Sequence, residues 1–202
     1  MSTEELVLSI EALGASINLV WVMLGAFLVF FMHTGFAMVE AGFTRSKNAV
    51  NILMKNFLTI SLGGIVYYLV GFAFMFGDTA GGIIGTSGFA LSGVENIDTF
   101  VFQVMFAATC ATIISGAVAE RTNIFAYLGI IIIMTSVIYP VVGHWVWSGS
   151  GWLSDKGFVD FAGSTVVHLT GAVAAFVAAA MIGPRIGKYA GKVVNVIPGH
   201  SI

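Results

Sequence analysis

One ionisable side chain lies inside an apolar run in the stretch Asp160-Phe161-Ala162-Gly163-Ser164-Thr165-Val166-Val167-His168-Leu169-Thr170-Gly171. An ionisable group inside a bilayer is costly, so it usually faces a partner or a water-filled path. When the stretch is continued as a helix, His168, Gly171, Ala175 and Ala179 follow spacings of three or four and share one face. Small residues on that face let another backbone approach closely. We therefore expect the imidazole to point into a helix bundle rather than at lipid.

The composition of the chain predicts a membrane protein with several spans. The 202 residues are 58% hydrophobic and only 9% charged, with a mean hydropathy of +0.98, whereas soluble domains carry roughly 25% charged residues. The formal net charge of -2 argues against a nucleic-acid partner. The single Cys110 lies in an apolar segment and is expected to be a small packing residue, not part of a disulfide framework or a cysteine metal site. We predict membrane lipid as the surroundings and no cofactor.

Five charge-free apolar windows reach the roughly 20 residues that one membrane span needs. The N-terminus lacks the basic region of a cleaved signal peptide, so the first window is expected to remain as a span. The windows cover about residues 17–39, 57–76, 99–119, 124–147 and 163–182, and together they predict an all-α polytopic membrane protein.

The distribution of Lys and Arg predicts how these spans are oriented in the cell membrane. Nearly all basic residues fall on one side of the predicted membrane, which the positive-inside rule makes cytoplasmic. The N-terminus is therefore expected outside, and the C-terminal end of the chain inside. The residues on the cytoplasmic side are Arg45, Lys47 and Lys55 after the first span, Arg121 after the third, and Arg185, Lys188 and Lys192 after the fifth, whereas Lys156 lies in an outer loop.

An odd number of spans indicates one half of a larger transporter. Many transporters consist of two inverted-topology repeats with the substrate path between them. Five spans reverse the orientation of whatever follows, so a second set of five would be inverted. The chain therefore has the organisation expected of one such repeat.

Aromatic residues gather at the predicted outer ends of the third and fourth spans. Phe102 and Phe106 are four residues apart and share a helix face, and Trp147 ends the fourth span. Ordinary packing and the aromatic belt of a membrane interface explain each of them taken alone. Together they form a candidate cage for a small cation, because each cation–π contact contributes about 0.5–2 kcal/mol. Asp160 lies at the same level, where it is expected to cap the fifth helix, to attract the cation, or to do both.

Four motifs carry a resemblance to a known family. They are Phe36-Ala37-Met38-Val39-Glu40-Ala41-Gly42-Phe43-Thr44-Arg45-Ser46-Lys47-Asn48, Gly116-Ala117-Val118-Ala119-Glu120-Arg121, Gly143-His144-Trp145-Val146-Trp147, and Asp160 to His168 continued through Arg185. On these residues the chain resembles the ammonium transporter family (Amt/Mep/Rh), most closely its bacterial and archaeal Amt branch. The resemblance implies that residues 1–202 are the N-terminal half of the domain, with five transmembrane helices that form its first inverted repeat.

The resemblance also implies a role for each candidate residue. Phe102, Phe106, Trp147 and Asp160 match the outer ammonium-recruitment site of the family, and Phe106 matches one of two phenylalanines that close the pore mouth. His168 matches the first of two histidines along a narrow hydrophobic pore. The family assembles as a homotrimer with one pore per subunit. The second histidine, the second gating phenylalanine and a hydroxyl of the outer site belong to the half that is absent, so these residues alone are not expected to conduct.

Other polar residues are expected to be structural, and no metal-ligand cluster or nucleophile–base pair indicates an enzyme. The expected contacts are a helix-packing hydrogen bond for His33, an interfacial belt position for His144, a pair of Glu40 with Arg45 or Lys47, and a pair of Glu120 with Arg121.

Solvation determines the expected mechanism. A cation stripped of water in an apolar pore is destabilised by on the order of tens of kcal/mol, which a few cation–π contacts do not offset. We therefore expect ammonium to be recruited at the outer cage, to lose its proton there, and to pass His168 as neutral ammonia. One alternative is the ammonium-sensing membrane domain of a signalling receptor with a cytoplasmic regulatory or signalling partner. Another is a purely structural truncated subunit.

Overall fold

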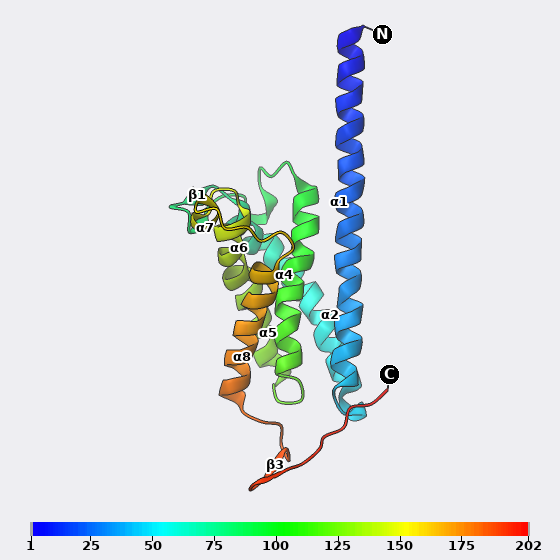
Figure 1. Ribbon diagram of the computed structural model, residues 1–202, viewed down its shortest axis with the longest axis vertical. Coiled ribbons are helices and arrows are strands. Elements are labelled where there is room, and N and C mark those ends of the chain that lie inside the picture. Colours follow the sequence, from blue (N-terminus) through cyan, green and yellow to red (C-terminus); the bar gives the residue numbers. More distant parts are fainter. Residues whose placement is uncertain (1, 202) are drawn as a thin grey trace.

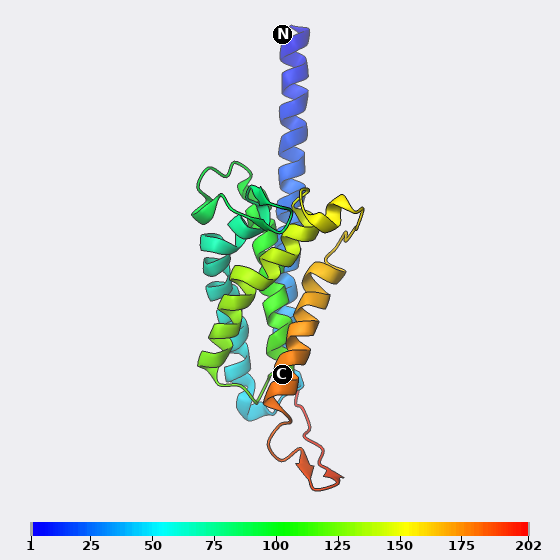
Figure 2. The same cartoon turned by 90° about the vertical axis from the view of Figure 1, so that its left-hand side faces the viewer.

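The first helix is much longer than the other four spans (Figure 1) in the computed structural model, which describes residues 2–201. Helix α1 (Thr3–Gly42) begins well before the apolar window expected from about residue 17. The hydroxyl of Ser2 accepts from the N–H of Glu5 at 3.2 Å, and the Glu5 carboxylate accepts from the N–H of Ser2 at 2.7 Å. This reciprocal cap fixes the helix start. The N-terminal part of α1 consequently extends beyond the bundle in both views (Figure 2).

Within residues 2–201, five helical segments are long and apolar enough to cross a membrane, which confirms the predicted fold class. Helix α4 (Ile97–Ala117) is the third of them and is α-helical throughout. The second joins α2 (Ala49–Val66), the π-helical turn η2 (Tyr67–Gly71) and α3 (Phe72–Phe76). The fourth joins α5 (Ile124–Ile133), the π-helical turn η4 (Met134–Ile138) and α6 (Tyr139–Trp147). The fifth joins the π-helical turn η5 (Ser164–Leu169) to α8 (Thr170–Ile182).

Short elements occupy the loops at both ends of the bundle (Figure 1). At one end, strand β1 (Thr79–Ala80) pairs antiparallel with β2 (Ile84–Gly85), so that Thr79 lies opposite Gly85. The 3-10 turn η3 (Phe89–Leu91) and the short helix α7 (Trp152–Asp155) belong to the same end. The other end holds the 3-10 turn η1 (Ser46–Asn48) and the pair of strands β3 (Tyr189–Ala190) and β4 (Val193–Val194).

Helix α4 lies at the centre of the bundle, with α1, α2 and α8 packed around it. Its buried side chains include Ala107, Cys110 and Ala111, and the prediction that Cys110 is a packing residue is confirmed. Gly171 of α8 lies so close that an added Cβ would be 2.9 Å from the Cys110 carbonyl oxygen. Small residues permit this approach, and the resulting van der Waals contact holds helices together where lipid weakens the hydrophobic effect.

The prediction that Lys55 is a loop charge after the first span is wrong. Helix α2 begins at Ala49, so Lys55 lies inside it with a side chain only 3% exposed. The Glu40 carboxylate of α1 lies 3.4 Å from the Lys55 ammonium group and compensates its charge. Pairing with a neighbouring helix is what allows a charge to lie within a span.

Candidate functional site

Three aromatic side chains meet where α4 begins and α6 ends. The rings of Phe102 and Phe106 stand edge to face with centroids 5.0 Å apart, and those of Phe106 and Trp147 do so at 6.0 Å. All three are half-buried. The structure therefore brings together the aromatic residues that the sequence placed at the outer ends of two spans. Half-buried rings in this arrangement present π faces, which attract cations.

The carboxylate of Asp160 caps the fifth span. Asp160 is only 8% exposed, and both of its oxygens accept hydrogen bonds from the backbone at the start of η5. Such charge-assisted bonds are about twice as strong as neutral ones. The capping role predicted from the sequence is confirmed. The donors to Oδ1 are the N–H groups of Gly163 at 2.8 Å and Ser164 at 3.0 Å and the Ser164 hydroxyl at 3.3 Å, and the donors to Oδ2 are the N–H groups of Thr165 at 2.8 Å and Val166 at 2.9 Å.

These contacts also determine the charge of Asp160. Burial by itself would raise the pKa of its carboxyl group, but the backbone N–H donors outweigh burial and lower that pKa from its ordinary value. Asp160 is therefore a fixed negative charge beside the aromatic residues.

Asp160 and Gly163 hold Trp147 in place. The indole N–H of Trp147 donates to the backbone carbonyl of Asp160 at 2.6 Å. Gly163 has φ +88°, and a Cβ there would lie 3.1 Å from the Trp147 ring. Glycine is required both by this left-handed conformation and by the space. The aromatic trio and the capping carboxylate thus form one unit, which we call the outer group: Phe102, Phe106, Trp147 and Asp160.

His168 is exposed on the surface of the five helices, so it does not point into the bundle that these five form among themselves. Gly171 and Ala175 of α8 are buried as predicted. His168, however, belongs to the π-helical turn η5, whose hydrogen bonds span one more residue than those of an α-helix. Within this turn, Val166 and Val167 are the buried residues.

The sequence profile of the family described as Ammonium Transporter Family matches residues 20–202. The chain belongs to the ammonium transporter family.

Curated relatives of this transporter family are similar over nearly the whole chain. Ammonium transporter Amt2 of Archaeoglobus fulgidus is 44% identical over 201 residues, which cover 92% of this chain and 43% of the relative. Ammonium transporter Amt2 of Haloferax mediterranei is 47% identical over 197 residues, with 92% and 43% covered. The chain thus spans less than half the length of these relatives.

Solved structures of the family share its fold. A sensor Amt protein superposes with a TM-score of 0.92 at 39% identity, over 95% of this chain and 50% of that one. Candida albicans Mep2 superposes with a TM-score of 0.81 at 27% identity, over 91% and 43%. These likenesses confirm the prediction that the five transmembrane helices form the first repeat of an ammonium-transporter fold.

Two further histidines of the chain are structural. The Nε2 atom of His33 lies 3.3 Å from the Met105 carbonyl, which confirms a helix-packing hydrogen bond. His144 lies near the end of α6, as expected, but the belt role expected for it is wrong, because its side chain is fully buried. Its Nδ1–H donates to the Met75 carbonyl at 2.8 Å, so its Nε2 accepts from the Thr79 hydroxyl at 2.9 Å. His144 thereby ties α6 to the β1–β2 hairpin.

Glu120 joins three loops at the opposite end of the bundle from the outer group. Its side chain is fully buried, and it does not pair with Arg121 as predicted. Oε1 lies 2.9 Å from Nε of Arg45 and also accepts from the Asn48 amide, and Oε2 lies 2.7 Å from Nη1 of Arg185. Arg121 donates instead to backbone carbonyls. No local pattern in the sequence indicates these partners, because they lie 65 or more residues away from Glu120.

Glu40 likewise has partners other than those predicted. Arg45 is bound to Glu120, and Glu40 pairs with Lys55 inside the bundle. One signal for this pair exists in the sequence, since Lys55 lies among apolar residues of α2 and an isolated charge in a span needs a partner.

Proposed function

We propose that this chain forms the ammonium-recruiting half of an ammonium transporter. The observation that carries the proposal is the outer group: three aromatic rings, one of which is hydrogen-bonded to the backbone of Asp160, whose carboxylate is buried, within a chain of this family. Cation–π attraction together with a fixed negative charge suits a small cation such as ammonium. Among residues 2–201 there is no group of three or more metal-ligating side chains, and we propose a transporter, not an enzyme.

In the proposed mechanism, ammonium gives its proton to a water molecule at the outer group and ammonia continues past His168. The proton crosses separately and rejoins ammonia on the cytoplasmic side, so that one charge moves for each ammonium transported. Desolvation of the intact cation along an apolar path would cost on the order of tens of kcal/mol. The exposed position of His168 leaves its imidazole available to a path between this repeat and a second, inverted one. Imidazole both donates and accepts hydrogen bonds, which suits a neutral ammonia molecule.

The proposed topology places the outer group and the N-terminus outside the cell. Arg45, Arg121 and Arg185 meet at the opposite end, which the positive-inside rule makes cytoplasmic. We further propose that the complete protein carries a second inverted half and assembles as a homotrimer in the cell membrane.

Replacing Trp147 with leucine in a transport-competent protein that contains this chain is expected to weaken recruitment. Loss of one cation–π contact of about 0.5–2 kcal/mol raises the half-saturating ammonium concentration by about twofold to thirtyfold. The measurement is ammonium-dependent current in proteoliposomes. Trp145→Leu is the matched control, because Trp145 also donates to a backbone carbonyl, that of Ile83, but lies outside the outer group. An identical concentration dependence for Trp147→Leu and the parent would contradict the proposal that these aromatic residues form a cation-binding cage.

Replacing His168 with alanine is expected to lower the maximal ammonium current or to change selectivity over other cations. The loss of one hydrogen bond to the passing guest corresponds to about twofold to tenfold in rate. Leu169→Ala is the control, since Leu169 is the next residue and is also exposed. A His168→Ala protein with the current and selectivity of the parent would argue against a pore role.

A sensor is the second candidate, because the sensor Amt protein is similar over 95% of this chain. In that case the outer group binds ammonium, and a cytoplasmic partner or domain responds to the ammonium-bound state. Ammonium binding without current, measured by calorimetry and electrophysiology on the same preparation, would favour sensing over transport.

A further inference from the structure

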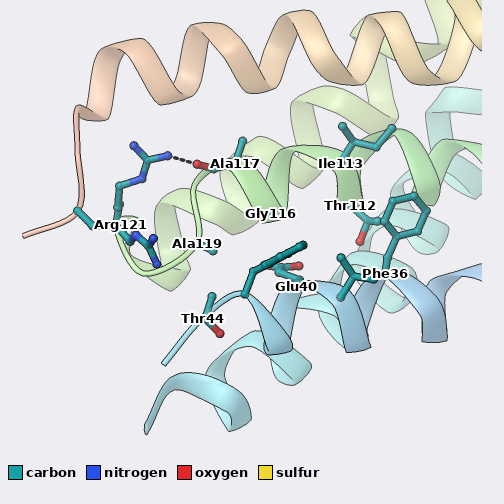
Figure 3. Close-up of a pocket in the computed structure, with 12 residues that line it drawn as sticks. Phe36, Glu40, Thr44, Thr112, Ile113, Gly116, Ala117, Ala119 and Arg121 are labelled. Atoms are coloured by element: carbon teal, nitrogen blue, oxygen red, sulfur yellow. Dashed lines mark hydrogen bonds between the residues drawn. The ribbon is translucent and has the colours of Figure 1, made fainter. Parts of the chain in front are cut away.

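A cavity of about 410 Å3 lies between α1 and α4 at the proposed cytoplasmic end (Figure 3). Glu40 of α1 lines one side of it, and Thr112 and Ile113 of α4 line the other. Gly171, three residues beyond His168, packs against Ile113. The cavity therefore follows His168 in the direction of the proposed cytoplasmic end.

Glu40 forms part of a buried ion pair at the wall of this cavity. The side chains of Glu40 and Lys55 are 5% and 3% exposed. Oε1 of Glu40 accepts from Lys55 at 3.4 Å and from the Ser115 hydroxyl at 2.7 Å, and Oε2 accepts from the Asn56 amide at 2.8 Å. A carboxylate has about four acceptor positions, so these three donors leave room for a further donor from the cavity.

The groups around Lys55 are those that bind an ammonium ion. The Lys55 ammonium group contacts the Glu40 carboxylate, the Ser115 carbonyl at 3.2 Å and the face of the Tyr127 ring at 4.6 Å from its centroid. A carboxylate, a carbonyl and an aromatic face together already hold one tethered ammonium group beside the cavity.

Packing alone is a weak reason for a charge pair at this position. Taking two charges out of water is costly, and apolar residues of similar volume are often equally stable or more stable in their place. Ionisable residues inside a membrane usually serve function instead. Glu40 also differs from its buried partner Lys55 in lining the cavity.

We propose that Glu40 is an inner binding site for ammonium at the cytoplasmic mouth of the pathway. The proposal rests on the proposed transport function and extends it to the end opposite the outer group. Ammonium in the cavity donates to the Glu40 carboxylate, and Lys55 positions that carboxylate while partly compensating its charge.

Other charged and titratable groups around the site keep the binding weak. Lys55 from α2 and Tyr127 from α5 face Glu40, and Arg121 and Arg185 line the cavity toward the loops. The positive charges of Lys55 and of the two arginines favour release of a cation to the cytoplasm. A conducting site needs this balance, because an ion must enter it and also leave.

The test uses Glu40→Gln in a transport-competent protein that contains this chain, oriented in liposomes. Ammonium is added on the cytoplasmic side, and the inward ammonium current is measured as that concentration rises. The half-inhibiting cytoplasmic concentration is expected to rise about tenfold, because one charge-assisted contact is lost. Cytoplasmic ammonium also lowers the concentration gradient that drives the inward current, but it does so equally in both proteins. An inhibition curve of Glu40→Gln that matches that of the parent therefore overturns the proposal.

A double variant separates binding from folding. Glu40→Leu combined with Lys55→Met removes the carboxylate and the ion pair while it keeps the volume filled, and thermal unfolding checks that the protein stays folded. A folded double variant with the shifted inhibition curve supports the inner site, and it decides the question if Glu40→Gln does not fold. Inhibition like that of the parent shows a structural pair only. If no protein that contains this chain carries ammonium into liposomes, by current or by uptake, that result would instead refute the transport function itself.

Discussion

Replacing Asp160 with alanine is expected to abolish the ammonium-dependent current and to lower the free energy of unfolding by about 3 kcal/mol or more. The carboxylate is the acceptor for four backbone N–H groups at the start of η5, and water does not reach this buried position easily. Its loss leaves those donors unpaired and frees the backbone carbonyl that holds the Trp147 indole. The outer group then loses both its charge and its geometry.

Asp160→Asn separates these two losses. Asparagine keeps one carbonyl oxygen for the cap but removes the negative charge, so stability is expected to recover in part while recruitment of ammonium stays weak. Thermal unfolding in detergent and proteoliposome currents measure the two effects on the same preparations. A wild-type current in Asp160→Ala would contradict the role of the carboxylate in the site, and a wild-type unfolding temperature would contradict its role at the helix start.

Replacing Glu120 with glutamine is expected to lower the free energy of unfolding by about 3 kcal/mol. The change removes the buried negative charge that Arg45 and Arg185 share, so two cations repel each other across the junction of three loops. Glu95→Gln is the control, because Glu95 is exposed. Equal unfolding temperatures for Glu120→Gln and Glu95→Gln would contradict the predicted role of the junction.

The same carboxylate predicts how stability depends on pH. Burial by itself would raise the pKa of Glu120, but hydrogen bonds from Arg45, Arg185 and Asn48 outweigh it and lower that pKa from 4.5 to about 2. A depressed pKa in the folded state stabilises the protein fully above pH 4.5, and the contribution is lost as pH falls from 4.5 toward 2. Unfolding temperatures across this window are expected to fall more steeply for the parent than for Glu120→Gln.

The spans and the residues of the outer group could be predicted from the sequence, because hydropathy and helical spacing are local signals. Apolar windows of sufficient length identify membrane helices directly. Phe102 and Phe106 share a face through helical spacing, and an even number of spans between two residues fixes which membrane side they occupy. Asp160 lies just before a helix, where its capping role follows from the unpaired N–H groups of any helix start.

The buried polar pairs depended on contacts between distant segments. Glu40, Glu120 and His144 each have several possible partners near them in sequence, yet each binds a residue that packing brings from another element. Likewise, the π-helical turn that contains His168 does not appear in the residue spacing, which assumes one constant helical period.

The sequence by itself therefore determined the membrane class, the five helices, the family and the residues of the outer group. Only the tertiary structure decided which charges neutralise one another, which way His168 faces and where a cavity meets Glu40. The physical reason is that hydropathy and helical period are properties of one segment, whereas charge pairing and burial depend on how several helices pack together.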